Sequence, residues 1–180
     1  MSRLCAMLAL VVFVSAVAGC DDKPSVFIAL DSDFATFESW PSVMLGSEPL
    51  PGHPPGPRFG YLNRKAPKGA KQYPVGTVIV KAIEPPGALD TGWEIFAMAK
   101  RGGNFNPEGA LNWEFFRLKI VDGAPHIVTR GLTAADPDDG GLGYFDQLGN
   151  DFVDMCNGCH GTKASVATDH VLSPLLQLGM

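Results

Sequence analysis

The sequence has little charge, few cysteines and no long apolar run beyond its first residues. Its composition excludes several classes of protein. Charged residues make up 18% of the 180 residues and the net charge is −5, so no basic surface for nucleic acid is expected. Hydrophobic residues make up 46%, which excludes wholesale disorder. Glycine and proline are abundant instead, with 21 and 15 residues. They exclude a helical bundle, because both residues interrupt helices.

The first 20 residues have the form of an export signal. A positively charged start precedes an apolar run over 4–18, which is too short to span a membrane. The run ends at Val17-Ala18-Gly19-Cys20, which resembles the lipobox of bacterial lipoproteins, where the cysteine is acylated. We therefore predict a signal peptide over 1–19, lipidation of Cys20, and an exported protein anchored on the periplasmic side of a bacterial membrane. Ordinary cleavage that leaves Cys20 as a thiol is the alternative.

Short strand-like segments dominate the remaining sequence. The strands expected from β-branched or alternating residues are 77–83, 94–100 and 113–121. Asp122-Gly123 predicts a hairpin turn after the third of them. Apolar residues at helical spacing predict a brief helix from Phe34 to Trp40, ended by Pro41, and another helix over 145–155. The expected fold class is α+β: a mainly antiparallel β-sheet with a few short helices.

The strongest motif is Cys156-Asn157-Gly158-Cys159-His160. In a CxxCH motif the two thiols attach a haem covalently, and the histidine ligates its iron. A zinc site would need two further ligands, and His170 is one candidate, but no second CxxC exists. A redox-active dithiol is another alternative. We predict one covalent haem c, attached by Cys156 and Cys159 and ligated by His160.

The position of this motif predicts an open sixth coordination site on the iron. Only 20 residues follow His160, whereas small electron-transfer cytochromes carry CxxCH early and a methionine ligand far downstream. The opposite side of the haem must therefore be built from upstream residues, which are largely apolar. His53 and His126 are candidate ligands there, although loop and turn positions are expected for both. An open iron site binds small molecules, whereas a filled one mainly transfers electrons.

Five segments together resemble the cytochrome P-460 family, over roughly Tyr61 to Ser173. They are Tyr73–Lys81, Met98–Arg101, Asn112–Phe115, Cys156–His160 and Asp169–Leu172. The resemblance implies a mainly antiparallel β fold with a C-terminal c-type haem, often in a homodimer. The family includes enzymes that oxidise hydroxylamine, and its relatives, the beta-type cytochromes c′, bind nitric oxide in a crowded apolar pocket. The expected organisation is a tether with a short helix or loop over 20–58 and a haem domain over 59–180.

Two residues are expected to distinguish these branches. In the oxidising members a lysine is bonded to the haem macrocycle, and the resemblance implies this role for Lys81. Alternation places Lys81 with Thr77, Ile79 and Ile83, and a lysine that reaches the rim is the alternative. The oxidising members also use a carboxylate to accept protons from the substrate. Glu114 is the candidate, and a rim glutamate is the alternative for it.

Four apolar side chains are expected near the open site. They are Phe96, Met98, Phe115 and Phe116, and core packing is the alternative for each of them. The leading hypothesis is a monohaem cytochrome that turns over hydroxylamine or nitric oxide and passes electrons to a soluble electron-transfer protein. The alternative is a non-catalytic cytochrome that binds nitric oxide or transfers electrons. A homodimer is a possible assembly, and no nucleic acid partner is expected.

Overall fold

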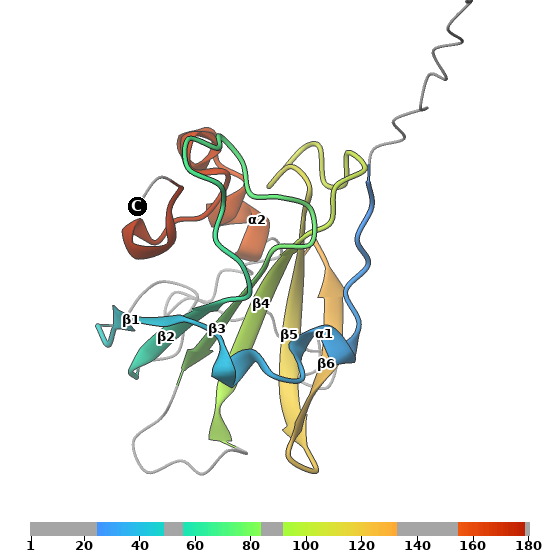
Figure 1. The fold of residues 1–180 in the computed structure, drawn as a ribbon, viewed down its shortest axis with the longest axis vertical. Helices are drawn as coiled ribbons and strands as arrows, with labels where there is room; N and C mark the ends of the chain where they lie inside the picture. Colours follow the sequence, from blue (N-terminus) through green and yellow to red (C-terminus); the bar gives the residue numbers. More distant parts are fainter. Residues whose placement is uncertain (1–24, 49–55, 84–91, 133–154, 179–180) are drawn as a thin grey trace, which may run out of the picture.

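The protein is built on one antiparallel β-sheet in which six strands follow one another in chain order (Figure 1). The computed structural model describes residues 25–48, 56–83, 92–132 and 155–178. The strands are β1 (Ser42–Gly46), β2 (Arg58–Leu62), β3 (Val78–Ile83), β4 (Glu94–Lys100), β5 (Trp113–Val121) and β6 (Ala124–Gly131). Every neighbouring pair is antiparallel, so consecutive strands need only local connections.

The expected α+β class is wrong, because the helices in the described part of the chain are too short to form a layer. The α-helices are α1 (Asp31–Phe34) and α2 (Met155–His160), and the 3₁₀ helices are η1 (Phe37–Ser39), η4 (Lys163–Thr168) and η5 (Pro174–Leu176). The helix expected from Phe34 to Trp40 is instead α1 followed by η1, since so short a segment gains little from helix propagation. The helix expected over 145–155 lies outside the described residues except for Met155, where α2 begins. Within the described ranges, no helix has the length and apolar character needed to cross a bilayer.

The sequence predicted the central strands but missed the first two. β4 and β5 have the predicted bounds, and β3 begins one residue later than expected. The hairpin turn is formed by Asp122 and Gly123, both with positive φ (52° and 78°), as a two-residue turn of type I′ requires. β1 and β2 were missed because both contain glycine, β1 directly follows Pro41, and β2 follows a proline-rich stretch. At Gly60 of β2 a Cβ would lie 2.8 Å from Leu176 Cδ1, so the side chain of Leu176 packs directly over this glycine and would have to shift for a larger residue.

Both faces of the sheet are covered. On one face, which we call the N-terminal face, Val80, Ala97 and Phe116 pack with residues of α1 and η1, and the rings of Phe34 and Phe116 are 5.3 Å apart. The opposite face, the C-terminal face, carries Ile79, Met98 and Phe115 and packs against residues that follow α2. Figure 1 shows the C-terminal segment over the end of the sheet near β1 to β3. The sheet therefore separates two apolar cores.

Candidate functional site

His160 ends α2 in a conformation suited to metal ligation. Its Nδ1 lies 2.6 Å from the backbone oxygen of His170, so Nδ1–H donates to that carbonyl and Nε2 carries the lone pair. The imidazole lies against the C-terminal face, with its centroid 5.5 Å from that of Phe115. Burial lowers the pKa of His160, and the charge of Lys81 adds to this, while the hydrogen bond to His170 opposes it. The neutral form favoured here is the form that binds metals.

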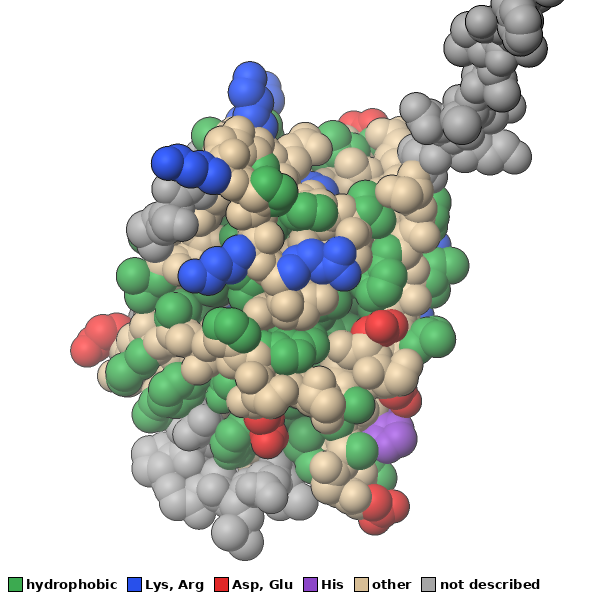
Figure 2. Space-filling view, viewed as in Figure 1, with side chains coloured by type: hydrophobic (Ala, Val, Ile, Leu, Met, Phe, Trp, Pro, Cys, Tyr) green, Lys and Arg blue, Asp and Glu red, His purple; other side chains and the backbone are tan. Residues whose placement is uncertain are grey.

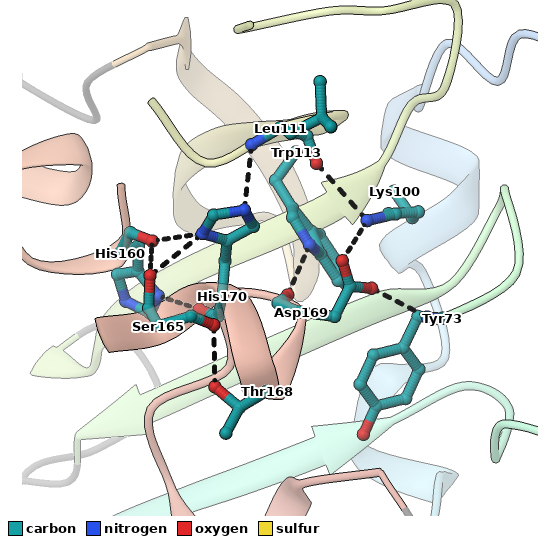
Figure 3. A network of polar contacts seen from close by, with 9 residues as sticks. All are labelled: Tyr73, Lys100, Leu111, Trp113, His160, Ser165, Thr168, Asp169 and His170. Carbon is teal, nitrogen blue, oxygen red and sulfur yellow. Dashed lines mark hydrogen bonds and ion pairs between the residues drawn. The ribbon is translucent and has the colours of Figure 1, made fainter. Parts of the chain in front are cut away.

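His160 and His170 hold one another through reciprocal hydrogen bonds (Figure 3). The Nδ1 of His170 lies 2.7 Å from the backbone oxygen of His160 and 2.9 Å from Ser165 Oγ. Its Nε2 accepts the backbone N–H of Leu111 at 3.2 Å, which places the ring proton on Nδ1. Both ring nitrogens of His170 are therefore engaged within the protein. The structure supports a positioning role for His170 and not the zinc-ligand alternative.

A buried ion pair holds the turn that carries His170. Asp169 Oδ1 lies 2.5 Å from Lys100 Nζ, and each side chain is 2% exposed. Asp169 Oδ2 accepts the backbone N–H of Tyr73 at 2.7 Å, and its backbone oxygen accepts Trp113 Nε1–H at 2.8 Å. Asp169 and His170 both have positive φ (51° and 66°), a conformation that costs energy without glycine. These contacts fix the turn that presents the His170 carbonyl to His160.

Asn157, between the two cysteines of the CxxCH motif, hydrogen-bonds α2 to the loop before β5. Asn157 Oδ1 accepts from Asn106 Nδ2 at 2.7 Å and from the Ala110 N–H at 3.2 Å. Asn157 Nδ2 in turn donates to Asn106 Oδ1 at 3.1 Å. A Cβ on Gly161 would lie 2.9 Å from the Cα of Gly109, so the two backbones touch. Asn157 thus anchors the helix between the two cysteines, of which Cys156 is half-buried and Cys159 exposed.

The structure brings Lys81 to the cysteine and histidine of α2. The pKa of Lys81 is lowered to about 7, chiefly by burial; a negative charge on Cys156 opposes this, and the charge of Arg58 adds to it. Lys81 in turn lowers the pKa of His160. Its Nζ lies 5.0 Å from the centroid of the Phe96 ring. Lys81, Cys156 and His160 therefore lie within electrostatic range of one another on the C-terminal face, and we call these three residues the cluster.

Three of the four apolar residues predicted near the open site lie on this face, and one does not. Met98 and Phe115 belong to the C-terminal core, which Cys156 also contacts. Phe96 pairs with Lys81 across β3 and β4. Phe116, by contrast, packs against Phe34 on the N-terminal face. Phe116 is therefore a core residue, which was the alternative to a place near the open site.

Glu114 also lies on the N-terminal face, away from α2. Its carboxylate is 3% exposed and lies 3.0 Å from Arg101 Nη1 and 2.8 Å from Arg130 Nε. Arg130 also donates to the backbone oxygen of Ala29 at 3.0 Å. Glu114 thus helps to hold the N-terminal segment to the sheet. A carboxylate on the C-terminal face that the sequence interpretation missed is Glu94, 3.0 Å from Arg117 Nη2.

The remaining candidate ligands do not join the cluster. His126 Nδ1 lies 3.0 Å from Asp31 Oδ2 at an exposed position on β6. Cys20 and His53 lie outside the described residues. In the part of the chain that the structure describes, no three His, Cys, Asp or Glu side chains lie together so as to hold a metal ion.

The residues present fit a covalently attached haem. The neutral His160 has Nε2 available, the two thiols lie three residues apart on one short helix, and an apolar sheet face lies beside them. The sequence interpretation missed the supporting network of Lys100, Ser165 and His170, although Asp169 and His170 belong to one of the segments that carried the family resemblance. No family model matches this chain, and no curated protein and no solved structure matches it either.

Proposed function

We propose that the protein is a monohaem c-type cytochrome, with Cys156 and Cys159 as attachment residues and His160 as the iron ligand. The observation that carries the proposal is the orientation of His160, whose Nδ1–H donates to the His170 carbonyl and leaves Nε2 for a metal. Hydrogen bonding of this kind fixes the tautomer and raises the basicity of a ligating imidazole. When bound, the haem supplies a one-electron redox centre and a site for a small molecule.

The proposed chemistry is turnover of a small nitrogen species, hydroxylamine or nitric oxide, as in the cytochrome P-460 family. The position of Lys81 beside Cys156 and His160 supports this branch, since the family resemblance gives this lysine a bond to the macrocycle. Phe96, Met98 and Phe115 would exclude water from the same face. The electrons would pass to a soluble electron-transfer protein.

A second candidate function is binding of nitric oxide, or electron transfer, without turnover. The position of Glu114 favours it, because its two arginine partners hold this carboxylate on the opposite face. Glu114 is therefore not proposed as the proton acceptor. The carboxylate on the C-terminal face, Glu94, is likewise held by an arginine, Arg117. An apolar pocket whose nearby carboxylates are engaged in this way would bind a small neutral ligand and leave it unchanged.

The absorption spectrum of the reduced, haem-loaded protein tests these two functions. A strongly red-shifted Soret band that Lys81→Ala abolishes is expected for the oxidising type, because the variant lacks the amine that would bond to the haem. Glu114→Gln is the control and should leave the band unchanged. A normal five-coordinate spectrum in the unmodified protein would favour the second function. A six-coordinate low-spin spectrum would contradict an open site.

We further propose that the mature protein is exported and lipid-anchored through Cys20. The lipobox-like end of the apolar run supports this location, since acyl chains on a cysteine can hold a protein on a membrane. Expression in a bacterium followed by fractionation is the test. The unmodified protein should sediment with membranes, and Cys20→Ala should release it. Retention of that variant in the membrane fraction would contradict the anchor.

A further inference from the structure

The loop between β2 and β3 carries an unusual concentration of positive charge. Arg64, Lys65, Lys68 and Lys71 fall within eight residues that contain no acid, in a chain whose net charge is −5. The three lysines are exposed. Arg64 folds back, since a Cβ on Gly76 would lie 3.2 Å from its guanidinium. Arg64 is exposed as well, so all four cations add to the charge that this loop presents to solvent, and the three lysines carry most of it.

This loop lies against the segment that follows His160. Ala70, Lys71 and Gln72 line a surface hollow together with three residues from the C-terminal segment, namely Val166, Ala167 and Leu178. Tyr73 at the end of the loop donates its hydroxyl to the Leu176 carbonyl. η4 adds a fourth exposed lysine, Lys163. Figure 2 shows Lys and Arg side chains gathered mainly in the upper half of this view and Asp, Glu and His mainly in the lower half.

The segment that follows His160 also exposes apolar side chains, and one of them, Val166, lines the hollow with Lys71. Val166 is 60% exposed, Leu172 44% and Leu175 51%. Their segment is close to the iron ligand, because Ser165 Oγ lies 2.5 Å from the backbone oxygen of His160. We call the four lysines and these three residues the basic patch. A polar rim around an apolar centre is the usual anatomy of a protein interface.

The charge of the basic patch is available to a partner. Among the described residues, none of the ion pairs involves Lys65, Lys68, Lys71 or Lys163. Unpaired surface lysines steer an acidic protein into contact and set its orientation, and they add more to the association rate than to affinity. A partner that exchanges electrons must also approach the redox centre closely, which the position next to His160 permits.

We propose that the basic patch is the docking surface for an acidic electron-transfer protein. The proposal rests on the proposed cytochrome function and identifies the partner of the same site by its charge. One electron leaves this protein and reduces the partner by one electron, with no other change in either. An anionic lipid surface is the less favoured occupant, because lipid binding has no need of a site adjacent to the iron ligand.

The test compares two variants of the haem-loaded full chain that carry the same change in net charge. Lys68→Gln/Lys71→Gln removes two charges from the basic patch, and Lys119→Glu makes the same change on an exposed residue of β5. An acidic [2Fe–2S] ferredoxin serves as the binding probe, measured by surface plasmon resonance at low ionic strength. The double variant should raise Kd about tenfold, and Lys119→Glu should raise it about twofold or less. Equal effects of the two variants would overturn the proposal.

Small redox ions give a second measurement. Oxidation of the reduced protein by anionic ferricyanide should slow in Lys68→Gln/Lys71→Gln, and oxidation by cationic tris(phenanthroline)cobalt(III) should accelerate. Vesicles rich in phosphatidylglycerol that bind through the same lysines, without ferredoxin binding, would overturn the proposal in favour of lipid. A protein that carries no haem would instead refute the proposed function. The surface plasmon resonance signal for ferredoxin binding does not depend on haem absorption. Failure of the docking proposal and failure of the proposed cytochrome function are therefore distinguishable.

Discussion

Asp169→Asn is expected to lower the free energy of unfolding by about 3 kcal/mol, among the largest effects of any single change in the described structure. The variant leaves the Lys100 ammonium buried without its carboxylate, and both side chains are 2% exposed in the unmodified protein. Asparagine is the suitable replacement because it tolerates the positive φ of 51° at this position. Urea unfolding followed by circular dichroism, on samples of equal haem content, measures the loss.

The matched control for this prediction removes the orphaned charge as well. Lys100→Met in the Asp169→Asn background should recover part of the lost stability, because a buried charge without a partner costs more than a neutral pair of similar volume. If Asp169→Asn costs less than about 1 kcal/mol, the ion pair does not hold the turn. Equal stability of the single and double variants would likewise count against the buried charge as the cause.

Alternation along the strands predicted which side chains share a face, but not which face meets α2. The sequence placed Lys81 with Ile79, and alternation along 113–121 likewise pairs Glu114 with Phe116. The structure has both pairs on common faces. Both faces of this sheet are buried, so an apolar environment did not distinguish them. The register of the strands shows which side chains share a face, since Lys81 of β3 lies opposite Phe96 of β4. That register depends on strand pairing, which one sequence does not contain.

The supporting network was beyond sequence reasoning for a similar reason. Tyr73 and Asp169 are 96 residues apart in the chain, and Lys100 and Asp169 are 69 apart. No local pattern indicates that these groups meet. CxxCH, in contrast, is a local motif, so Cys156, Cys159 and His160 could be predicted as haem residues without knowledge of the fold. Polar groups that meet across the sheet can only be paired once the chain is folded.

The last prediction concerns the reciprocal pair of histidines. His170→Ala should lower the free energy of unfolding by about 2–3 kcal/mol, because the Leu111 N–H and the His160 carbonyl both lose a ring partner. It should also lower the iron–histidine stretching frequency of the reduced protein in resonance Raman spectra. The reason is that a loosened turn weakens the hydrogen bond from His160 Nδ1 to the carbonyl of residue 170, and with it the basicity of the ligand.

His170→Asn separates positioning from mere packing. Asparagine tolerates the positive φ of 66° at this position, and its amide N–H can donate to the His160 carbonyl in place of the imidazole. The asparagine variant should therefore recover most of the stretching frequency, even where its stability stays below that of the unmodified protein. An iron–histidine band that is unchanged in His170→Ala would show that His170 has no part in orienting His160. A band that shifts equally in both variants would assign His170 a packing role alone.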